Sequence, residues 1–286
     1  MQSHKILPKT IVITGASSGL GEALAVCYAQ PGHTLGLLAR RNNELERVAQ
    51  LCRDKGATVE VGVVDITDSK AVARWVQTFD AKHNIDLLIA NAGVFTGHGP
   101  NGNMETVDDI TWVLRTNLEG VAITIAAALP MMRERERGRI AIIGSLCGLQ
   151  PQADAPAYSA SKAGVMSYGE ALREFLIPDN VSVSLIYPGH IETAQVKNHV
   201  GALPGLISAD RAAAHIKKKL DKGRSFIAFP WSLLQLIRAG RCIHWRMRAR
   251  LGQGFRFHVS RSQLANDARR HDAPQPKEPM LSSAKA

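Results

Sequence analysis

Short apolar runs alternate with amphipathic stretches along the chain from residue 10 to about residue 190. Runs rich in β-branched residues and bounded by turn residues predict strands, whereas apolar positions three or four apart predict helices. The predicted strands are 10–14, 34–39, 58–64, 85–90, 138–145, 181–187 and 225–229. The predicted helices are 20–30, 43–55, 68–82, 105–132, 155–176 and 209–222, with a loop expected at 189–207.

The predicted strands are apolar throughout, which is typical of a parallel sheet that helices cover on both faces. Strands separated by helices imply right-handed crossover connections. The sequence therefore predicts an α/β fold, a doubly wound parallel sheet of the Rossmann type with about seven strands. We expect residues 1–230 to form this domain, 231–263 a basic amphipathic helical extension, and 264–286 a disordered tail, because the tail is polar and contains three prolines.

Charge is unevenly distributed along the 286 residues, whose formal net charge is +10. Residues 211–261 contain 13 lysines and arginines and one acid, so the rest of the chain is close to neutral. No nucleic-acid-binding motif accompanies this segment, which makes nucleic acid a poor fit as a partner. No apolar stretch approaches the ~20 residues of a membrane span, and no signal peptide is expected. Four scattered cysteines without metal-ligand spacing favour a reduced, cytoplasmic location.

A glycine-rich turn, "TGASSGLG" at 14–21, follows the first predicted strand and precedes a helix. Gly15, Gly19 and Gly21 would let the backbone approach a pyrophosphate, which the free N–H groups and the dipole of the helix N-terminus bind. A purely structural turn is the alternative. The position after the first strand of an α/β pattern favours a dinucleotide site.

The second predicted strand ends in "LLARR", residues 37–41. An acid at this place binds the ribose hydroxyls of NAD, whereas an arginine accommodates the 2′-phosphate of NADP. Ala39 stands where the acid is expected, and Arg40 and Arg41 follow it. We therefore predict that NADP(H) is preferred over NAD(H), with Arg40 as the phosphate contact.

Further motifs follow in order along the chain: "NAG" at 91–93, Asn117 in "RTNLEG", Ser145, "YSASK" at 158–162 and "PGHIET" at 188–193. With the glycine-rich turn, they resemble the short-chain dehydrogenase/reductase family over roughly residues 8–230. The G-x3-G-x-G spacing is similar to that of the single-domain branch. This resemblance implies a nicotinamide-dependent oxidoreductase that interconverts a carbonyl and an alcohol.

The resemblance implies a catalytic set of Asn117, Ser145, Tyr158 and Lys162. Tyr158 would donate and accept the proton. Lys162, four residues later on the same helical face, would lower the pKa of the phenol and bind the nicotinamide ribose. Ser145 would hydrogen-bond the substrate oxygen, and Asn117 would anchor a water relay from Lys162 to solvent. A coincidental Tyr–Lys pair is the alternative, and the accompanying motifs argue against it.

The resemblance also implies the cofactor contacts. The glycine-rich turn would hold the pyrophosphate, Asp65 the adenine amino group, the turn at 91–93 the adenosine ribose, and residues 188–193 the carboxamide. The implied residues are Gly15, Ser17, Ser18, Gly19, Leu20, Gly21, Arg40, Arg41, Asp65, Ile66, Asn91, Ala92, Gly93, Tyr158, Lys162, Pro188, Gly189, Ile191 and Thr193. The family's N-N-A-G has alanine in its first place here, at Ala90, which touches no catalytic role.

Substrate specificity is expected in the loops 94–103, 146–156 and 189–207, whose apolar residues suggest a partly apolar pocket. The basic segment 230–257 has two interpretations. It lies on an anionic membrane surface, or it packs its apolar stripe on the core or on a sister subunit. The first would make the protein peripheral on the inner membrane surface, with a lipid-like or hydrophobic substrate.

Three functions therefore stay open. The first is NADP(H)-dependent reduction of a carbonyl, or the reverse, on a small molecule that is lipid-like or hydrophobic if the basic segment meets a membrane. The second is a soluble sugar or polyol dehydrogenase. The third is a non-catalytic cofactor-binding scaffold, against which the intact set of Asn117, Ser145, Tyr158 and Lys162 argues. The helices 105–132 and 155–176 resemble the family's usual dimer faces, so a homodimer or homotetramer is expected. No metal is expected.

Overall fold

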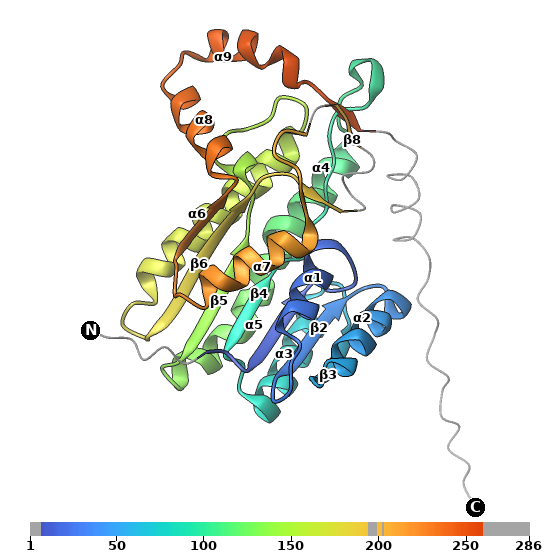
Figure 1. Cartoon of the computed structure of the whole chain (residues 1–286), viewed down its shortest axis with the longest axis vertical. Coiled ribbons are helices and arrows are strands. Elements are labelled where there is room, and N and C mark those ends of the chain that lie inside the picture. Colours follow the sequence, from blue (N-terminus) through green and yellow to red (C-terminus); the bar gives the residue numbers. More distant parts are fainter. Residues whose placement is uncertain (1–6, 194–198, 202, 260–286) are drawn as a thin grey trace, which may run out of the picture.

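Seven parallel strands form one sheet, which confirms the predicted doubly wound α/β fold (Figure 1). The computed structural model describes residues 7–193, 199–201 and 203–259. The sheet has the order β10-β6-β5-β4-β1-β2-β3, so the chain reverses its winding between β1 and β4. The strands are β1 (Thr10–Thr14), β2 (Thr34–Ala39), β3 (Thr58–Val63), β4 (Leu87–Ala90), β5 (Gly138–Ile143), β6 (Val181–Pro188) and β10 (Phe226–Phe229).

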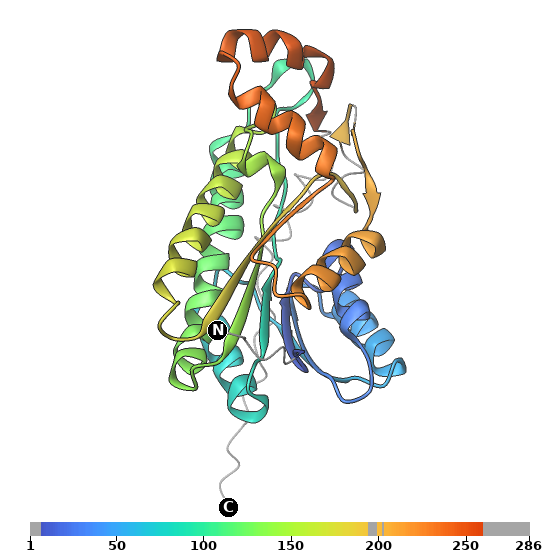
Figure 2. The same cartoon turned by 60° about the vertical axis from the view of Figure 1, so that its left-hand side comes forward.

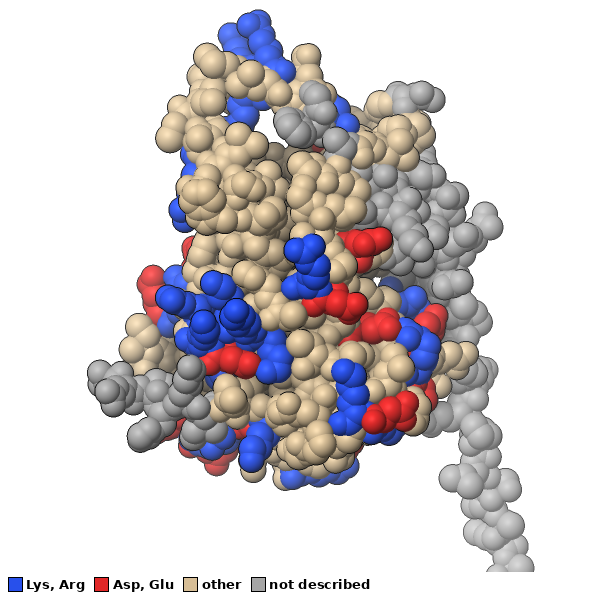
Figure 3. Space-filling model, viewed as in Figure 1, with Lys and Arg blue, Asp and Glu red and all other residues tan. Residues whose placement is uncertain are grey.

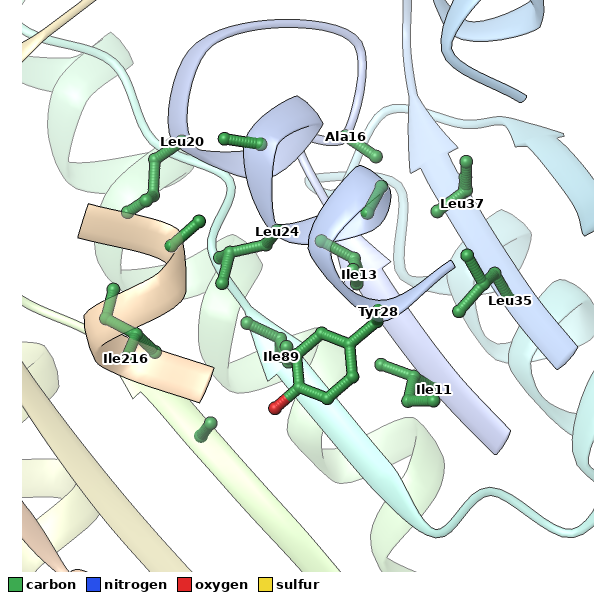
Figure 4. Packing of buried hydrophobic residues seen from close by; sticks show 14 of the residues in the cluster. Ile11, Ile13, Ala16, Leu20, Leu24, Tyr28, Leu35, Leu37, Ile89 and Ile216 are labelled. Carbon is green, nitrogen blue, oxygen red and sulfur yellow. The ribbon is translucent and has the colours of Figure 1, made fainter. Parts of the chain in front are cut away.

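Helices cover both faces of the sheet because successive strand residues point to opposite sides. Ile11 and Ile13 of β1 belong to one apolar cluster, and Val12 between them belongs to the other. Figure 4 shows the first cluster, where Tyr28 and Ile216 close over the sheet. The first layer has α1 (Gly19–Tyr28), α2 (Asn42–Asp54) and α7 (Ala209–Leu220); the second has α3 (Ser69–His83), α5 (Gly120–Glu134) and α6 (Pro156–Phe175).

The long helix predicted at 105–132 is interrupted in the structure. It consists of α4 (Val107–Leu114), a π-helical turn at Arg115–Glu119 and α5. A capping box between Thr106 and Asp109 fixes the start of α4. The turn itself was not predicted, because apolar residues continue at helical spacing on both sides of it. Such π turns recur at functional sites, and this one contains Asn117.

The combined stretch Val107–Glu134 is, within the described part of the chain, the one helix whose length and mean hydropathy of 1.2 suit a membrane span. Its residues Val121, Ile125 and Met132 are buried in the second apolar cluster. There α5 packs against α3. The stretch is therefore part of the layer that covers the sheet.

The C-terminal extension forms two helices where one was predicted, α8 (Trp231–Arg241) and α9 (Trp245–Leu251). The side chain of His244 accepts a hydrogen bond from the N–H of Arg246 and so caps the second helix. The chain then returns to the body, where β11 (His258–Val259) pairs antiparallel with β8 (His199–Val200) (Figure 2). The predicted tail 264–286 lies outside the described residues, and the domain boundaries stay a prediction.

The loop predicted at 189–207 also contains short strands. β7 (Ile191–Glu192) and β9 (Ile207–Ser208) pair in parallel. The pairing brings the end of the "PGHIET" motif to the start of α7. Backbone hydrogen bonds thus hold Ile191–Glu192 against Ile207–Ser208, which the Gly- and Pro-rich composition of the segment did not indicate.

Candidate active site

The predicted cofactor turn and the "NAG" turn meet at the carboxyl edge of the sheet, where β1 and β4 are neighbours. The hydroxyl of Thr14 accepts hydrogen bonds from the N–H groups of Asn91 and Ala92, both at 3.1 Å. In return, Asn91 Nδ2 donates to the carbonyl oxygen of Thr14 at 2.9 Å. Open α/β sheets bind ligands in the crevice at such a reversal point.

The glycine-rich turn packs directly on this junction. Gly15 has a φ of +66°, and a Cβ there would lie 2.7 Å from Cα of Ala92. A Cβ at Gly21 would overlap the carbonyl oxygen of Gly15. Both positions therefore require glycine. Ser18 precedes α1 without a side-chain capping bond, so the N-terminal N–H groups of α1 suit a phosphate ligand.

The two arginines after β2, Arg40 and Arg41, contact different residues. Arg41 donates to the hydroxyls of Ser17 at 3.0 Å and Ser18 at 2.8 Å, so it lies against the glycine-rich turn. Arg40 lies 3.7 Å from a carboxylate oxygen of Asp65. Arg41 thus orders the turn, and Arg40 lies beside Asp65, the residue predicted to contact the adenine. The phosphate contact assigned to Arg40 stays a prediction.

Asp65 and Ile66 lie at the end of β3, as predicted for the adenine side of the site. Oδ1 of Asp65 accepts hydrogen bonds from the N–H and the hydroxyl of Thr67, at 2.9 and 2.8 Å. Ile66 is buried, and its side chain occupies the space next to Gly120. These contacts fix both residues, and the predicted adenine contacts remain untested.

The "PGHIET" segment reaches the same edge from β6. Thr193 lies against Gly19, since a Cβ on that glycine would be 3.0 Å from Thr193 Cγ2. Ile191 is buried, and the N–H of Gly189 donates to the carbonyl oxygen of Phe229 at 2.7 Å. The structure therefore brings the segment predicted for the carboxamide next to the turn predicted for the pyrophosphate.

Asn117 connects three of the segments predicted to form the site. Its Oδ1 accepts from the N–H of Val94 at 2.7 Å, and its Nδ2 donates to the Val94 carbonyl at 2.9 Å. Nδ2 also donates to the hydroxyl of Ser161 at 3.1 Å. Ser161 in turn donates to the carbonyl oxygen of Tyr158 at 2.7 Å. The amide therefore ties the turn after β4 to the first turns of α6.

Lys162 is buried beside the predicted proton donor. Its Nζ donates to the carbonyl oxygen of Ile143 at 2.9 Å and lies 5.8 Å from the centroid of the Tyr158 ring. A Cβ on Gly93 would be 3.4 Å from this Nζ, so the turn after β4 packs closely against the ammonium. Burial lowers the pKa of Lys162 to about 8.

The expected lowering of the Tyr158 pKa is not what the structure shows. Burial raises the pKa of Tyr158, the nearby Cys147 raises it further, and a hydrogen bond with Ser145 lowers it. The prediction counted the charge of Lys162 and left out the desolvation of the phenol. The rise favours the protonated form of the phenol, which an unshifted tyrosine also has at neutral pH.

Cys147 is a site residue that the sequence did not single out. It lies two residues after Ser145, whose hydroxyl accepts a hydrogen bond from the Cys147 N–H at 3.1 Å. Burial raises the pKa of the Cys147 thiol, a hydrogen bond with Ser145 lowers it, and the charge of Lys162 lowers it too. A thiol next to Ser145, Tyr158 and Lys162 helps to define the space beside the phenol.

Glu105 is a second residue that the sequence did not reveal. Its Oε1 accepts from the hydroxyl of Thr96 at 2.9 Å, and its Oε2 accepts from the N–H of Ala157 at 3.1 Å. The carboxylate thereby satisfies an N-terminal N–H group of α6 and anchors the loop 94–103 to it. The contact joins residues 52 positions apart, which no local pattern discloses.

Asp154 and Arg256 attach the C-terminal segment to the loop before α6. Arg256 Nε donates to both carboxylate oxygens of Asp154, at 2.7 and 2.9 Å, and the N–H of Phe257 donates to one of them at 3.1 Å. The Asp154 side chain is 6% exposed. A buried carboxylate with charge-assisted partners is a strong local restraint.

The attached segment forms an aromatic wall beside Tyr158. The ring of Phe95 lies edge-on to Tyr158, with centroids 4.9 Å apart, and the ring of Phe257 lies 6.1 Å from Phe95. Phe257 also lines a cavity of about 370 Å³ together with His98, Met104 and Arg256. A larger cavity of about 600 Å³, lined by Cys27 and Lys217, contains none of the predicted site residues.

Comparison with known proteins agrees with this geometry. A sequence model of the family described as short chain dehydrogenase matches residues 9–202. An uncharacterized oxidoreductase of Myxococcus xanthus is 34% identical over 226 residues, which cover 79% of this chain and 88% of that protein. The 11-beta-hydroxysteroid dehydrogenase-like 4A protein of Arabidopsis thaliana is 32% identical over 239 residues, covering 80% and 79%.

Solved structures show the same fold. A short-chain dehydrogenase from Sphingobium yanoikuyae in complex with NADPH is 28% identical with a TM-score of 0.69, and the match covers 82% of this chain and 94% of that one. A short chain dehydrogenase/reductase from Burkholderia phymatum in complex with NAD is 24% identical with a TM-score of 0.74 and the same coverage.

Replacing Thr14 by valine tests the junction of β1 and β4. Thr14→Val keeps the shape of the side chain but leaves two buried N–H groups without an acceptor. We expect the free energy of unfolding to fall by about 2–4 kcal/mol, measured by urea denaturation. Thr14→Ser, which keeps the hydroxyl, should retain most of the stability. Equal stability of the valine variant and the wild type would contradict this role.

The Asp154–Arg256 contact predicts a local effect. In Asp154→Asn the carboxylate charge is lost, so residues 256–259 should open more readily. We expect their amide hydrogens to exchange at least tenfold faster, whereas the strands of the sheet keep their protection. Arg250→Gln removes a neighbouring arginine of α9 and should leave the exchange unchanged. Unaltered protection in Asp154→Asn would show that the contact does not hold the segment.

Proposed function

Because the chain belongs to the short-chain dehydrogenase family, we propose that it is an NADP(H)-dependent oxidoreductase that reduces a hydrophobic carbonyl compound to an alcohol, or catalyses the reverse. The observation that carries the proposal is the gathering of Ser145, Tyr158 and Lys162 beside the glycine-rich turn and the 188–193 segment. All of these lie at one edge of the sheet.

In the proposed mechanism, Tyr158 is the proton donor for carbonyl reduction. A tyrosine phenol carries its proton at neutral pH, as a donor must, and burial, which raises the pKa of Tyr158, favours that form further. Ser145 donates a hydrogen bond to the same substrate oxygen and supports the charge that develops there. Since burial lowers the pKa of Lys162 only to about 8, the ammonium stays charged at neutral pH and stabilises the phenolate that remains.

The residues at the carboxyl edge fit a nicotinamide dinucleotide. Gly15, Gly19 and Gly21 with the N-terminus of α1 would hold its pyrophosphate, the turn at 91–93 its adenosine ribose, and the 188–193 segment its carboxamide. When bound, the cofactor supplies the hydride for reduction. Asn117 holds the turn after β4 against α6 through its hydrogen bonds to Val94 and Ser161. Its part in a water relay remains a prediction.

The aromatic wall favours a hydrophobic substrate over a sugar or polyol. The half-buried Phe95 presents a carbon surface next to Tyr158, and the buried Phe257 packs near Phe95, whereas a polyhydroxylated substrate would need hydrogen-bonding partners there. The name of the Arabidopsis thaliana relative refers to a hydroxysteroid, an alcohol on an apolar skeleton. Both points support an apolar ketone as the substrate class.

We also propose an assembly state and a location for the protein. Val107 and Ile110 on α4 and Phe175 on α6 are exposed apolar residues on the predicted dimer faces, which supports a homodimer or homotetramer. All four cysteines lie among the described residues and none is in a disulfide, in keeping with a cytoplasmic location.

Tyr158→Phe tests catalysis directly. The variant keeps the ring but loses the proton donor, so we expect turnover of an aryl ketone with NADPH to fall about a thousandfold. NADPH affinity, followed by nicotinamide fluorescence, should change less than threefold. Sorbose or another sugar should be a far poorer substrate of the wild type. A wild type that binds NADPH and turns over none of these compounds would support the scaffold instead.

The two arginines make separable predictions for the cofactor. Arg40→Ala should lower the affinity for NADPH at least tenfold, because only NADPH carries the 2′-phosphate. The affinity for NADH should stay within about twofold of the wild-type value. Arg41→Ala should lower the affinities for NADPH and NADH by the same factor, since Arg41 orders the glycine-rich turn through Ser17 and Ser18. Titration of each variant with both cofactors decides. A wild type with equal affinity for the two would refute the NADPH preference.

A further inference from the structure

The C-terminal arch, defined as residues 231–251, is attached to the body at one end and stands clear of it at the other (Figures 1 and 2). Leu234 of α8 is buried in the second apolar cluster, and Leu233 and Ile237 pack against that cluster. In contrast, α9 contains no buried residue. The first helix therefore fixes the arch at the end of β10, and the second is presented to the surroundings.

The arch exposes large apolar side chains that the fold does not cover. Five of them are more than half exposed: Trp231, Leu236, Trp245, Met247 and Leu251. The exposed fraction reaches 72% for Trp231. Exposed apolar side chains that are gathered in one short segment indicate a surface that binds a membrane or another molecule. Tryptophan in particular favours the interface between water and lipid.

The same segment is strongly cationic. Residues 231–259 contain six arginines and no aspartate, glutamate or lysine. Figure 3 shows basic side chains at the crest of the arch, with no acidic ones beside them in this view. In α9, Arg246, Arg248 and Arg250 alternate with apolar residues, so charge and apolar surface are interleaved. In a bilayer the lipid head groups lie next to the outer acyl region, so the former can bind the arginines while the latter contacts the apolar side chains.

We propose that the arch docks the protein on the anionic surface of a lipid bilayer. Arginines would bind lipid phosphates, while Trp245, Met247 and Leu251 enter the region just below the head groups. A second copy of the chain is a poorer occupant, because a two-fold contact would bring like-charged arches together. Nucleic acid would satisfy the arginines but leave the apolar side chains in water.

Docking would place the bilayer next to the candidate active site. Immediately after the arch, Arg256 binds Asp154 and Phe257 joins the aromatic wall at Tyr158. Met104, which is 72% exposed, lines the adjoining cavity. An apolar substrate dissolved in the membrane would thus have a short route to the phenol. This last step rests on the proposed function, whereas the docking does not.

Vesicle flotation of the full chain tests the docking. We expect the wild type to float with vesicles of phosphatidylcholine containing phosphatidylglycerol, to float much less with phosphatidylcholine alone, and to be released by salt. Arg246→Gln, Arg248→Gln and Arg250→Gln combined should weaken partitioning about a hundredfold, since each arginine near the surface contributes roughly fivefold. Trp245→Ser, Met247→Ser and Leu251→Ser combined should weaken it at least tenfold.

A matched control removes equal charge elsewhere. The control combines Lys218→Gln, Lys222→Gln and Arg224→Gln, whose positions lie in the last turn of α7 or just after it. This variant should change partitioning less than threefold. NADPH binding by every variant, measured without vesicles, should match the wild type and so report intact folding. Quenching of tryptophan emission by brominated lipid should disappear in the Trp245 variant set.

Four outcomes would overturn the proposal. They are failure of the wild type to bind anionic vesicles, an equal loss in the α7 control, retention of binding in both arch variants, and a change of oligomeric state in the arch variants without loss of vesicle binding. The last would make the arch a subunit interface. Absence of turnover with preserved flotation would instead refute only the proposed function.

Discussion

A single buried amide holds the candidate active site together. Asn117 is 0% exposed, and its three hydrogen bonds link the turn after β4 to Ser161, which binds the backbone of Tyr158. Because these groups are buried, the loss of one partner would leave a polar group unsatisfied, which costs stability. Asn117 lies within the π turn at Arg115–Glu119, and such turns recur at functional sites.

The sequence predicted the sheet correctly, and it predicted that the motifs would converge, for a physical reason. Continuous apolar runs mark strands buried on both faces, and the carboxyl ends of parallel strands lie along one edge. Polar motifs at those ends, such as Asn91 after β4 and Ser145 after β5, must therefore converge. Thr14, Gly15 and Asn91 confirm this convergence with direct contacts.

Other features could not be predicted, because they depend on contacts between distant residues or on burial. Glu105 reaches Ala157, and Asp154 reaches Arg256, across separations that carry no periodic signal. The pKa of Tyr158 was predicted to fall, but it rises because the surroundings desolvate the phenol. The π turn was missed because apolar residues continue at helical spacing on both sides of it, and the break at His244 was missed because a capping histidine has no strong signature.

The Asp154–Arg256 contact also has a consequence for how the chain is made. The two residues are 102 positions apart, and Arg256 is the later one to leave the ribosome. Until then the carboxylate of Asp154 has no arginine to bury it, and the loop before α6 must remain hydrated. The dinucleotide half of the sheet, built from β1 to β4, is complete well before this point. A nascent chain would thus acquire its cofactor crevice early and its substrate wall last.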